Sequence, residues 1–221
     1  MQTAPDAINE AGLPKGERSR RALLEATLRV IARGGVEAVT HRRVAAEAGV
    51  SHGATTYHFT SRDDIILQAF RHYIRLITDH LDAAWDDLDD DPGSVPSVIT
   101  FLVDFTRREF SDPELVLAEY ELIVYAARNE ALAREYRAWQ RSLVSGLATV
   151  LEACGAPRPS EAARIVVGVC RAFELEQLTH PSNGPDQLKQ RLELLLSGLV
   201  GTPEPSRGRP RARSRVRSSS R

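Results

Sequence analysis

Apolar residues recur at intervals of three and four along most of this chain, which is the spacing of one face of an α-helix. They keep that period between Leu23 and Ile31, and again between Ile65 and Ile77. The alternation of apolar and polar residues that is typical of β-strands is absent. Glycine and proline interrupt the pattern and indicate where helices end. The sequence therefore predicts an all-α fold of about nine helices without strands.

The helical pattern divides the chain into four parts. Residues 1–15 are expected to form a flexible N-terminal arm, and residues 16–62 a unit of three short helices. Residues 63–201 are expected to form a larger helical domain, interrupted by an Asp-rich stretch, "DDLDDDPGSVP", with the composition of a solvated linker. Residues 202–221 contain seven Arg and almost no apolar residue, so we expect this tail to be disordered.

Charge is unevenly distributed, although the formal net charge of the whole chain is only −1. Residues 15–75 carry eleven Lys and Arg against six acidic residues. Residues 79–91 carry seven Asp and neither Lys nor Arg. The basic first unit therefore favours an anionic partner.

The cysteines and the N-terminus give no sign of a secreted or membrane protein. Cys154 and Cys170 are too few for a disulfide framework and lack metal-site spacing, so we expect buried thiols. The N-terminus has no apolar core of signal-peptide length, and no apolar run approaches the length of a membrane span. A cytoplasmic protein is therefore expected.

The stretch "HRRVAAEAGVSHGATTYHF", residues 41–59, predicts two short helices joined by a turn. Thr40 can cap the first helix and Ser51 the second, and Gly49 suits the left-handed backbone between them. The second helix has little to bury but many polar side chains. Such a pair is typical of a helix-turn-helix, whose second helix lies in the major groove of DNA.

A longer stretch, "RRALLEATLRVIARGGVEAVTHRRVAAEAGVSHGATTYHFTSRDDIILQAF", resembles the DNA-binding domain of the TetR/AcrR family of bacterial transcription regulators. The resemblance rests on the spacing of Gly35, Thr40, Ala45, Ala48-Gly49-Val50-Ser51, Gly53, Phe59 and Arg62. It implies a three-helix DNA-binding head and a larger helical body that usually encloses a small-molecule pocket. It also implies a two-fold homodimer formed through the last two long helices, here within residues 160–200.

The sequence departs from the family pattern at two positions of the second helix. Many members have Lys where this chain has His52, and Tyr is frequent where it has Thr56. The base contacts are therefore assigned from side-chain chemistry. The residues expected in the groove are His52, Ala54, Thr55 and Tyr57. The residues expected on phosphates are Thr40, Arg42, Arg43, Ser51, His58 and Arg62.

Aromatic residues repeat at helical spacing through the middle of the chain. Such residues can simply form a core, but the resemblance implies that these helices line a cavity. The expected ligand-binding residues are Phe101, Phe105, Tyr120 and Trp139. Mostly apolar walls would suit a small-molecule effector that is lipophilic or aromatic.

Neither a metal site nor an active site is expected. His41, His52 and His58 fall in the DNA-facing region without cysteine or clustered carboxylates. The charged residues of the middle helices are expected to be solvated, because no nucleophile motif accompanies them; these are Glu119, Glu121, Arg128 and Glu130. We therefore expect no enzyme and no cofactor.

The expected function is that of a sequence-specific transcriptional regulator: a homodimeric repressor that a ligand releases from a near-palindromic operator. An activator or a ligand-independent DNA-binding factor is the first alternative. A helical enzyme or a partner-binding protein is less favoured, because the sequence shows a basic head and no catalytic constellation. The Arg-rich tail either adds non-specific attraction to DNA or is dispensable.

Overall fold

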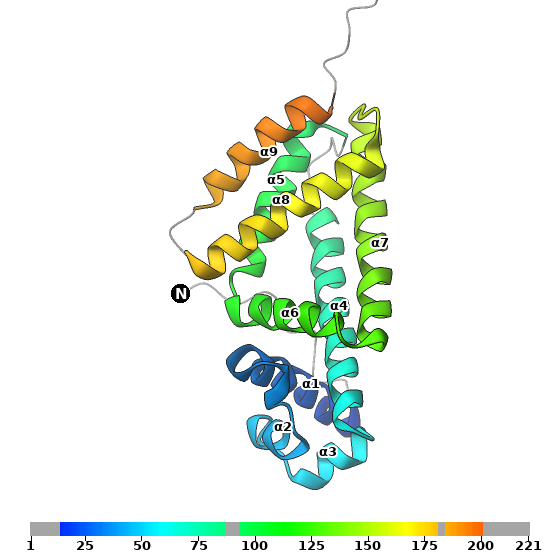
Figure 1. The fold of residues 1–221 in the computed structure, drawn as a ribbon, viewed down its shortest axis with the longest axis vertical. Helices are drawn as coiled ribbons and strands as arrows, with labels where there is room; N and C mark the ends of the chain where they lie inside the picture. Colours follow the sequence, from blue (N-terminus) through cyan, green and yellow to red (C-terminus); the bar gives the residue numbers. More distant parts are fainter. Residues whose placement is uncertain (1–13, 87–92, 181–183, 201–221) are drawn as a thin grey trace, which may run out of the picture.

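Helices make up almost all of the described structure, a computed structural model that covers residues 14–86, 93–180 and 184–200 (Figure 1). Within these ranges there are nine α-helices, one short 3-10 helix and no strand, as the sequence predicts. The C-terminal tail, most of the N-terminal arm and the centre of the Asp-rich stretch lie outside the described residues. The helices are α1 (Lys15–Gly34), η2 (Val36–Ala38), α2 (His41–Glu47), α3 (His52–His58), α4 (Arg62–Asp86), α5 (Val95–Glu109), α6 (Pro113–Ala126), α7 (Glu130–Ala153), α8 (Pro159–Thr179) and α9 (Pro185–Leu199).

Polar side chains begin several helices by accepting a hydrogen bond from a free backbone N–H of the first turn. Thr40 accepts from the backbone N–H of Arg43 at 3.1 Å, which begins α2 as predicted. Asp112 and Asn129 do the same for α6 and α7, at 3.2 and 3.1 Å. Gly49 has φ of 66°, the left-handed conformation that the turn between α2 and α3 requires.

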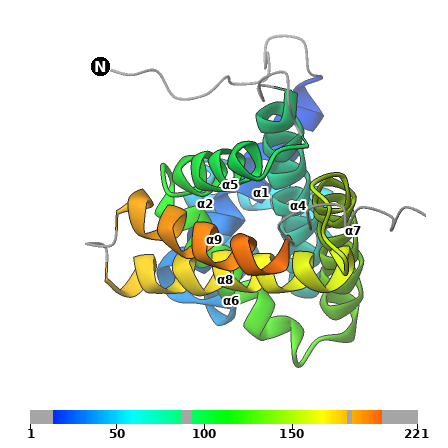
Figure 2. The ribbon, with the colours of Figure 1, turned by 90° about the horizontal axis from the view of Figure 1, so that it is seen from above.

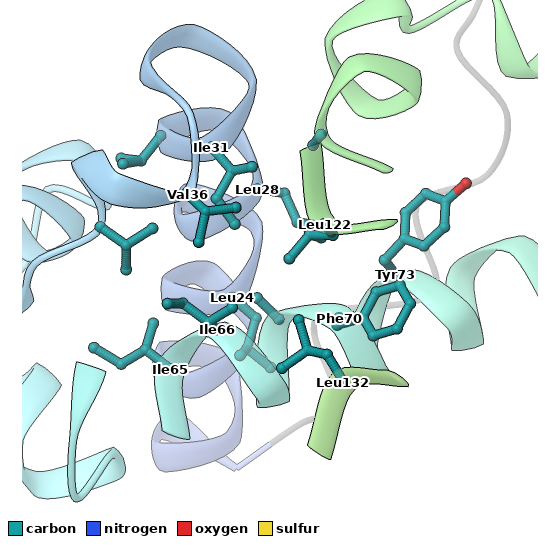
Figure 3. Close-up of a cluster of buried hydrophobic side chains, with 14 of the residues drawn as sticks. Leu24, Leu28, Ile31, Val36, Ile65, Ile66, Phe70, Tyr73, Leu122 and Leu132 are labelled. Atoms are coloured by element: carbon teal, nitrogen blue, oxygen red, sulfur yellow. The ribbon is translucent and has the colours of Figure 1, made fainter. Parts of the chain in front are cut away.

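The core of the three-helix head continues without a break into the body. Leu24 and Ile31 of α1 pack with Ile66 and Phe70 of α4, and Leu122 of α6 joins the same cluster (Figure 3). All five are essentially inaccessible to solvent. Apolar burial contributes roughly 25 cal/mol per Å², so this shared core holds α1, α4 and α6 together.

A second core lies at the other end of the molecule and joins α5, α7, α8 and α9. Leu188, Leu192 and Leu196 form the inward-facing row of α9, and Phe173 of α8 belongs to the same cluster. Figure 2 shows α8 and α9 side by side on the outside of the body. Two helices thus present a continuous outer face. Among the described residues, no helix is both long and apolar enough to span a membrane.

Candidate DNA-binding surface and body cavity

The helix-turn-helix lies at one end of the molecule, with α2 and α3 furthest from α8 and α9 (Figure 1). Tyr57 of α3 is 84% exposed, which is exceptional for an aromatic side chain in this structure. His52 is also exposed, and Ala54 is half-buried. The outer face of α3 therefore presents a ring, an imidazole and a methyl group to solvent, which suits contact with base edges in a major groove.

Thr55 does not belong to this outer face, so its predicted base contact is wrong. Its side chain is fully buried, and its hydroxyl has no hydrogen-bond partner among the described residues. The reason is the packing of α3, which turns the Thr55 side of this two-turn helix toward the head core.

Arg62 was predicted to bind phosphate, but the structure gives it an internal role. Its Nε donates to the backbone oxygen of Val39 at 3.0 Å, and its Nη2 donates to that of Val36 at 2.9 Å. The same Nη2 donates to the Glu37 carboxylate at 2.9 Å. The guanidinium thus ties the start of α4 to the segment after α1 through its Nε and Nη2 donors.

The other predicted phosphate contacts remain available to a ligand. Thr40, Arg42, Arg43 and Ser51 are exposed, and His58 is half-buried. Neither Arg42 nor Arg43 forms a salt bridge with any described residue, and Ser51 makes no side-chain cap on α3. In contrast, Arg29 and Arg33 of α1 are held by ion pairs to acidic residues of α2 and α6; these acidic residues are Glu47 and Glu114.

A cavity of about 550 Å³ lies inside the body, with walls from α4, α5, α6, α7 and α8. Three of the four predicted ligand-binding residues, Phe101, Phe105 and Trp139, lie on its wall. The rings of Phe101 and Phe105 stack with centroids 6.2 Å apart. Seven aliphatic residues share the remaining wall with polar and charged ones, a mixture that is common in small-molecule sites.

Tyr120, the fourth predicted ligand-binding residue, is not on the cavity wall. Its hydroxyl donates to the Glu174 carboxylate at 2.7 Å and also lies 3.1 Å from the backbone oxygen of Arg171. Tyr120 therefore supports a wall residue from behind, and its prediction as a direct contact is not supported by the geometry.

Charged groups inside the body were missed by the sequence analysis. Glu119, predicted to be a solvated charge, is only 3% exposed and lies on the cavity wall. It accepts from Arg171 at 2.8 Å and also from the hydroxyl of Tyr73. The Arg171 guanidinium in turn lies 5.4 Å from the centroid of the Trp139 ring. The prediction for Glu119 is wrong because α6 is buried on two sides.

Two further carboxylates, Glu109 and Glu174, lie on the same wall. Burial and the neighbouring Glu119 raise the pKa of Glu174 to about 7. Burial and the charge of Glu174 likewise hold the pKa of Glu109 well above its ordinary value. Arg171 and Glu174, three residues apart in an otherwise apolar part of α8, are the signal that could have pointed to buried charge here.

The described residues hold no group of three or more His, Cys, Asp and Glu that could bind a metal ion. His41 and His52 lie near each other, with ring centroids 6.3 Å apart, but no carboxylate or thiol joins them.

Two family models match this chain. Residues 23–69 match "Bacterial regulatory proteins, tetR family", and residues 93–202 match "Tetracyclin repressor-like, C-terminal domain". The chain is 32% identical over 133 residues to the HTH-type transcriptional regulator BetI of Brucella anthropi, covering 60% of this chain and 67% of BetI. It is 30% identical over 110 residues to the nicotine-responsive transcriptional repressor HdnoR of Paenarthrobacter nicotinovorans, covering 50% of this chain and 55% of HdnoR.

Solved structures share the fold along nearly their whole length. A transcriptional regulator from Pseudomonas aeruginosa PAO1 has a TM-score of 0.73 at 23% identity, covering 87% of this chain and 95% of that one. A regulator from Saccharomonospora viridis, solved in complex with choline, has a TM-score of 0.69 at 21% identity, covering 84% of this chain and 100% of that one. Together with the helix-turn-helix and the two family matches, these likenesses lead to one conclusion. The chain belongs to the TetR family of bacterial transcriptional regulators, which are generally DNA-binding repressors.

Proposed function

We propose that this protein is a homodimeric repressor that binds a near-palindromic operator and leaves it when a small molecule enters the body cavity. Residues 16–62 act as the DNA-binding head, and residues 63–201 act as the regulatory body. The observation that carries this proposal is the exposure of Tyr57 on α3, a helix that lies at one end of the molecule (Figure 1). An exposed tyrosine on the second helix of a helix-turn-helix can contact base edges through its ring and phosphate through its hydroxyl.

The outer face of α8 and α9 supports a dimer. On α8 an exposed stripe runs through Ile165, Gly168, Ala172 and Leu175, spaced at three and four residues. On α9 Leu194 is 80% exposed. A Cβ added at Gly168 would meet no atom within 4 Å, so this face is open to close approach by another helix. Two such faces related by a two-fold axis would bury each other and bring two heads to one operator.

Helix α6 supplies a physical connection between the cavity and the head. Glu119 lies on the cavity wall, whereas its neighbour Ala118 and Leu122 pack into the core shared with α1. At the N-terminal end of α6, Glu114 pairs with Arg33 of α1 at 3.1 Å. A ligand that displaces α6 therefore acts on α1 directly. A coupling free energy of about 1–3 kcal/mol is enough to change operator occupancy.

Small-molecule recognition by relatives supports an effector. One relative is named for its response to nicotine, and one structural neighbour was solved with choline. The cavity described above is of a size that small-molecule sites have in other proteins.

The test measures fluorescence anisotropy of the full chain on the DNA upstream of its own gene and on a scrambled duplex, at two salt concentrations. We expect discrimination of about a thousandfold at physiological salt. Tyr57→Ala should remove that discrimination, because a good contact contributes roughly 1–3 kcal/mol and a dimer loses two. Val124→Ala is the matched control, since Val124 is 66% exposed but lies on α6 of the body.

Three results would contradict the proposal. Equal binding to both duplexes that disappears with salt would indicate attraction by charge alone. Full operator affinity in Tyr57→Ala would remove α3 from the reading surface. Operator binding that no cavity ligand reduces would favour an activator or a ligand-independent factor.

A further inference from the structure

The cavity wall has an excess of negative charge. Its acidic residues are Asp82, Glu109, Glu119 and Glu174, and its one basic residue among the described positions is Arg171. Arg171 is already engaged, since its Nη1 donates to the Glu119 carboxylate at 2.8 Å. Glu109 and Glu174 therefore have no basic partner of their own in the described structure.

Glu174 is the most informative of these groups. Its side chain is only 8% exposed, and Tyr120 donates to one carboxylate oxygen, Oε2, at 2.7 Å. The other oxygen, Oε1, accepts no hydrogen bond from a described residue. This oxygen keeps some exposure, and Glu174 lies on the cavity wall. A largely buried carboxylate beside an apolar wall is stabilised by a bound cation, and without one it takes up a proton more readily.

Glu109 is a second acidic residue on the cavity wall without a basic partner among the described residues. It lies on α5, whereas Glu174 lies on α8; it is half-buried, and its carboxylate accepts no hydrogen bond from the described residues. Burial and the charge of Glu174 hold the pKa of Glu109 well above its ordinary value, which places the two carboxyl groups close enough to interact. Apart from Arg171, the described lining residues supply no positive charge to balance these two carboxyl groups.

The rest of the wall indicates what would carry that charge. Phe101, Phe105 and Trp139 contribute aromatic surface, and seven aliphatic residues contribute further apolar surface beside several Thr and Ser side chains. Aromatic faces attract organic cations, particularly where water is excluded. A hydrated inorganic cation would gain little from such walls, whereas an organic cation would bury its apolar part.

We infer that the cavity binds an organic cation, in which a protonated amine or quaternary ammonium group on an apolar body lies between Glu109 and Glu174. This inference rests on the proposed function, because it names the ligand class of the cavity proposed to regulate DNA binding. Glu119 and Arg171 form a neutral pair that holds the wall, and the two unpaired carboxylates provide the counter-charge.

Binding of a permanent cation should also release protons, since a carboxyl group must be ionised to act as counter-ion. Its apparent affinity should fall as the pH is lowered through about 7, where Glu174 takes up a proton. The titratable groups that surround Glu174 are Tyr73 on α4, Glu109 on α5, Glu119 and Tyr120 on α6, Tyr136 on α7, and Cys170 and Arg171 on α8. A neutral ligand would show no such fall.

The experiment compares two pairs of probes with the full chain, using tryptophan fluorescence because Trp139 lies on the cavity wall. The first pair is benzyltrimethylammonium and its uncharged carbon isostere, neopentylbenzene. The second is tetraphenylphosphonium and the similarly shaped anion tetraphenylborate. We expect the cation of at least one pair to bind tenfold or more tightly than its counterpart.

Substitutions then test whether the two carboxylates cause that preference. Glu109→Gln and Glu174→Gln should each weaken cation binding about tenfold and change neopentylbenzene binding by less than about threefold. Glu161→Gln is the matched control, because Glu161 lies on α8 but is exposed and away from the cavity. Unchanged binding of the neutral probe also shows that the variants are folded.

The inference is overturned if neither cation is preferred, or if the Gln variants keep the preference. These failures are distinct from failure of the proposed function, which is measured by operator binding without any probe. If the protein binds its operator specifically but prefers neutral probes, the inference of a cationic ligand is refuted and the proposed function is not. If the protein prefers cations but binds no operator, the proposed repressor function is refuted and the cation preference is not.

Discussion

Replacement of Thr55 by valine tests how α3 is oriented. The Thr55 hydroxyl is fully buried without a partner among the described residues, and a buried unsatisfied polar group costs about 1–3 kcal/mol. Valine has nearly the same shape and a similar helix propensity, so the substitution removes the cost and leaves the packing intact. We expect Thr55→Val to raise the free energy of unfolding by about 1 kcal/mol. For a chain of this size, that corresponds to an increase in Tm of about 2–4 °C.

The assay pairs thermal unfolding, followed by circular dichroism, with anisotropy on the operator. Thr56→Val serves as the control, because Thr56 is exposed and its hydroxyl lies 3.1 Å from the backbone oxygen of Gly53. This control should not stabilise the protein. Thr55→Val should leave operator affinity unchanged. A valine variant that loses operator affinity without gaining stability would show that Thr55 faces the DNA, and the orientation of α3 would be refuted.

Three other substitutions follow from the structure. Arg62→Met should lower the free energy of unfolding by about 2 kcal/mol in urea titrations, since it removes hydrogen bonds to Val36 and Val39; a loss confined to DNA affinity would restore its phosphate role. Leu194→Glu should convert the dimer to monomer in analytical ultracentrifugation, because it places charge on the exposed face of α9; an unchanged dimer would place the interface elsewhere. Burial lowers the pKa of His72 to about 4, so the unfolded chain binds more protons between about pH 6.5 and 4 and stability falls as the pH falls through that window. His72→Phe should remove roughly 2–4 kcal/mol of that loss, measured as the free energy of unfolding of both proteins against pH. Identical pH dependence in the two proteins would contradict the burial of a neutral imidazole.

Local patterns allowed most of the fold to be predicted. The helical period, the cap at Thr40 and the glycine turn at Gly49 each depend on a few neighbouring residues, so they could be predicted from the sequence. The exposure of Tyr57 also agrees with its predicted place on the reading face.

The errors arose where a side chain's position depends on distant partners. α3 is only seven residues long, so its pattern does not reveal that Thr55 faces inward. Arg62 meets acceptors that lie more than twenty residues earlier in the chain. Glu119 and Glu121 both interrupt an apolar run, and only the approach of Arg171, 52 residues later, identifies Glu119 as the buried one.

The core shared by head and body also limits how such regulators can exchange their parts. Ile66 and Phe70 complete the core around Leu24, yet both lie beyond residue 62, and Leu122 reaches the same cluster from α6 (Figure 3). A gene fusion that joined this head to a foreign body after residue 62 would supply new neighbours for α1. Unless those neighbours matched in volume, the hybrid would contain cavities or clashes costing several kcal/mol. A head of different DNA specificity can therefore replace this one only if it keeps the surface of α1 that packs against α4 and α6.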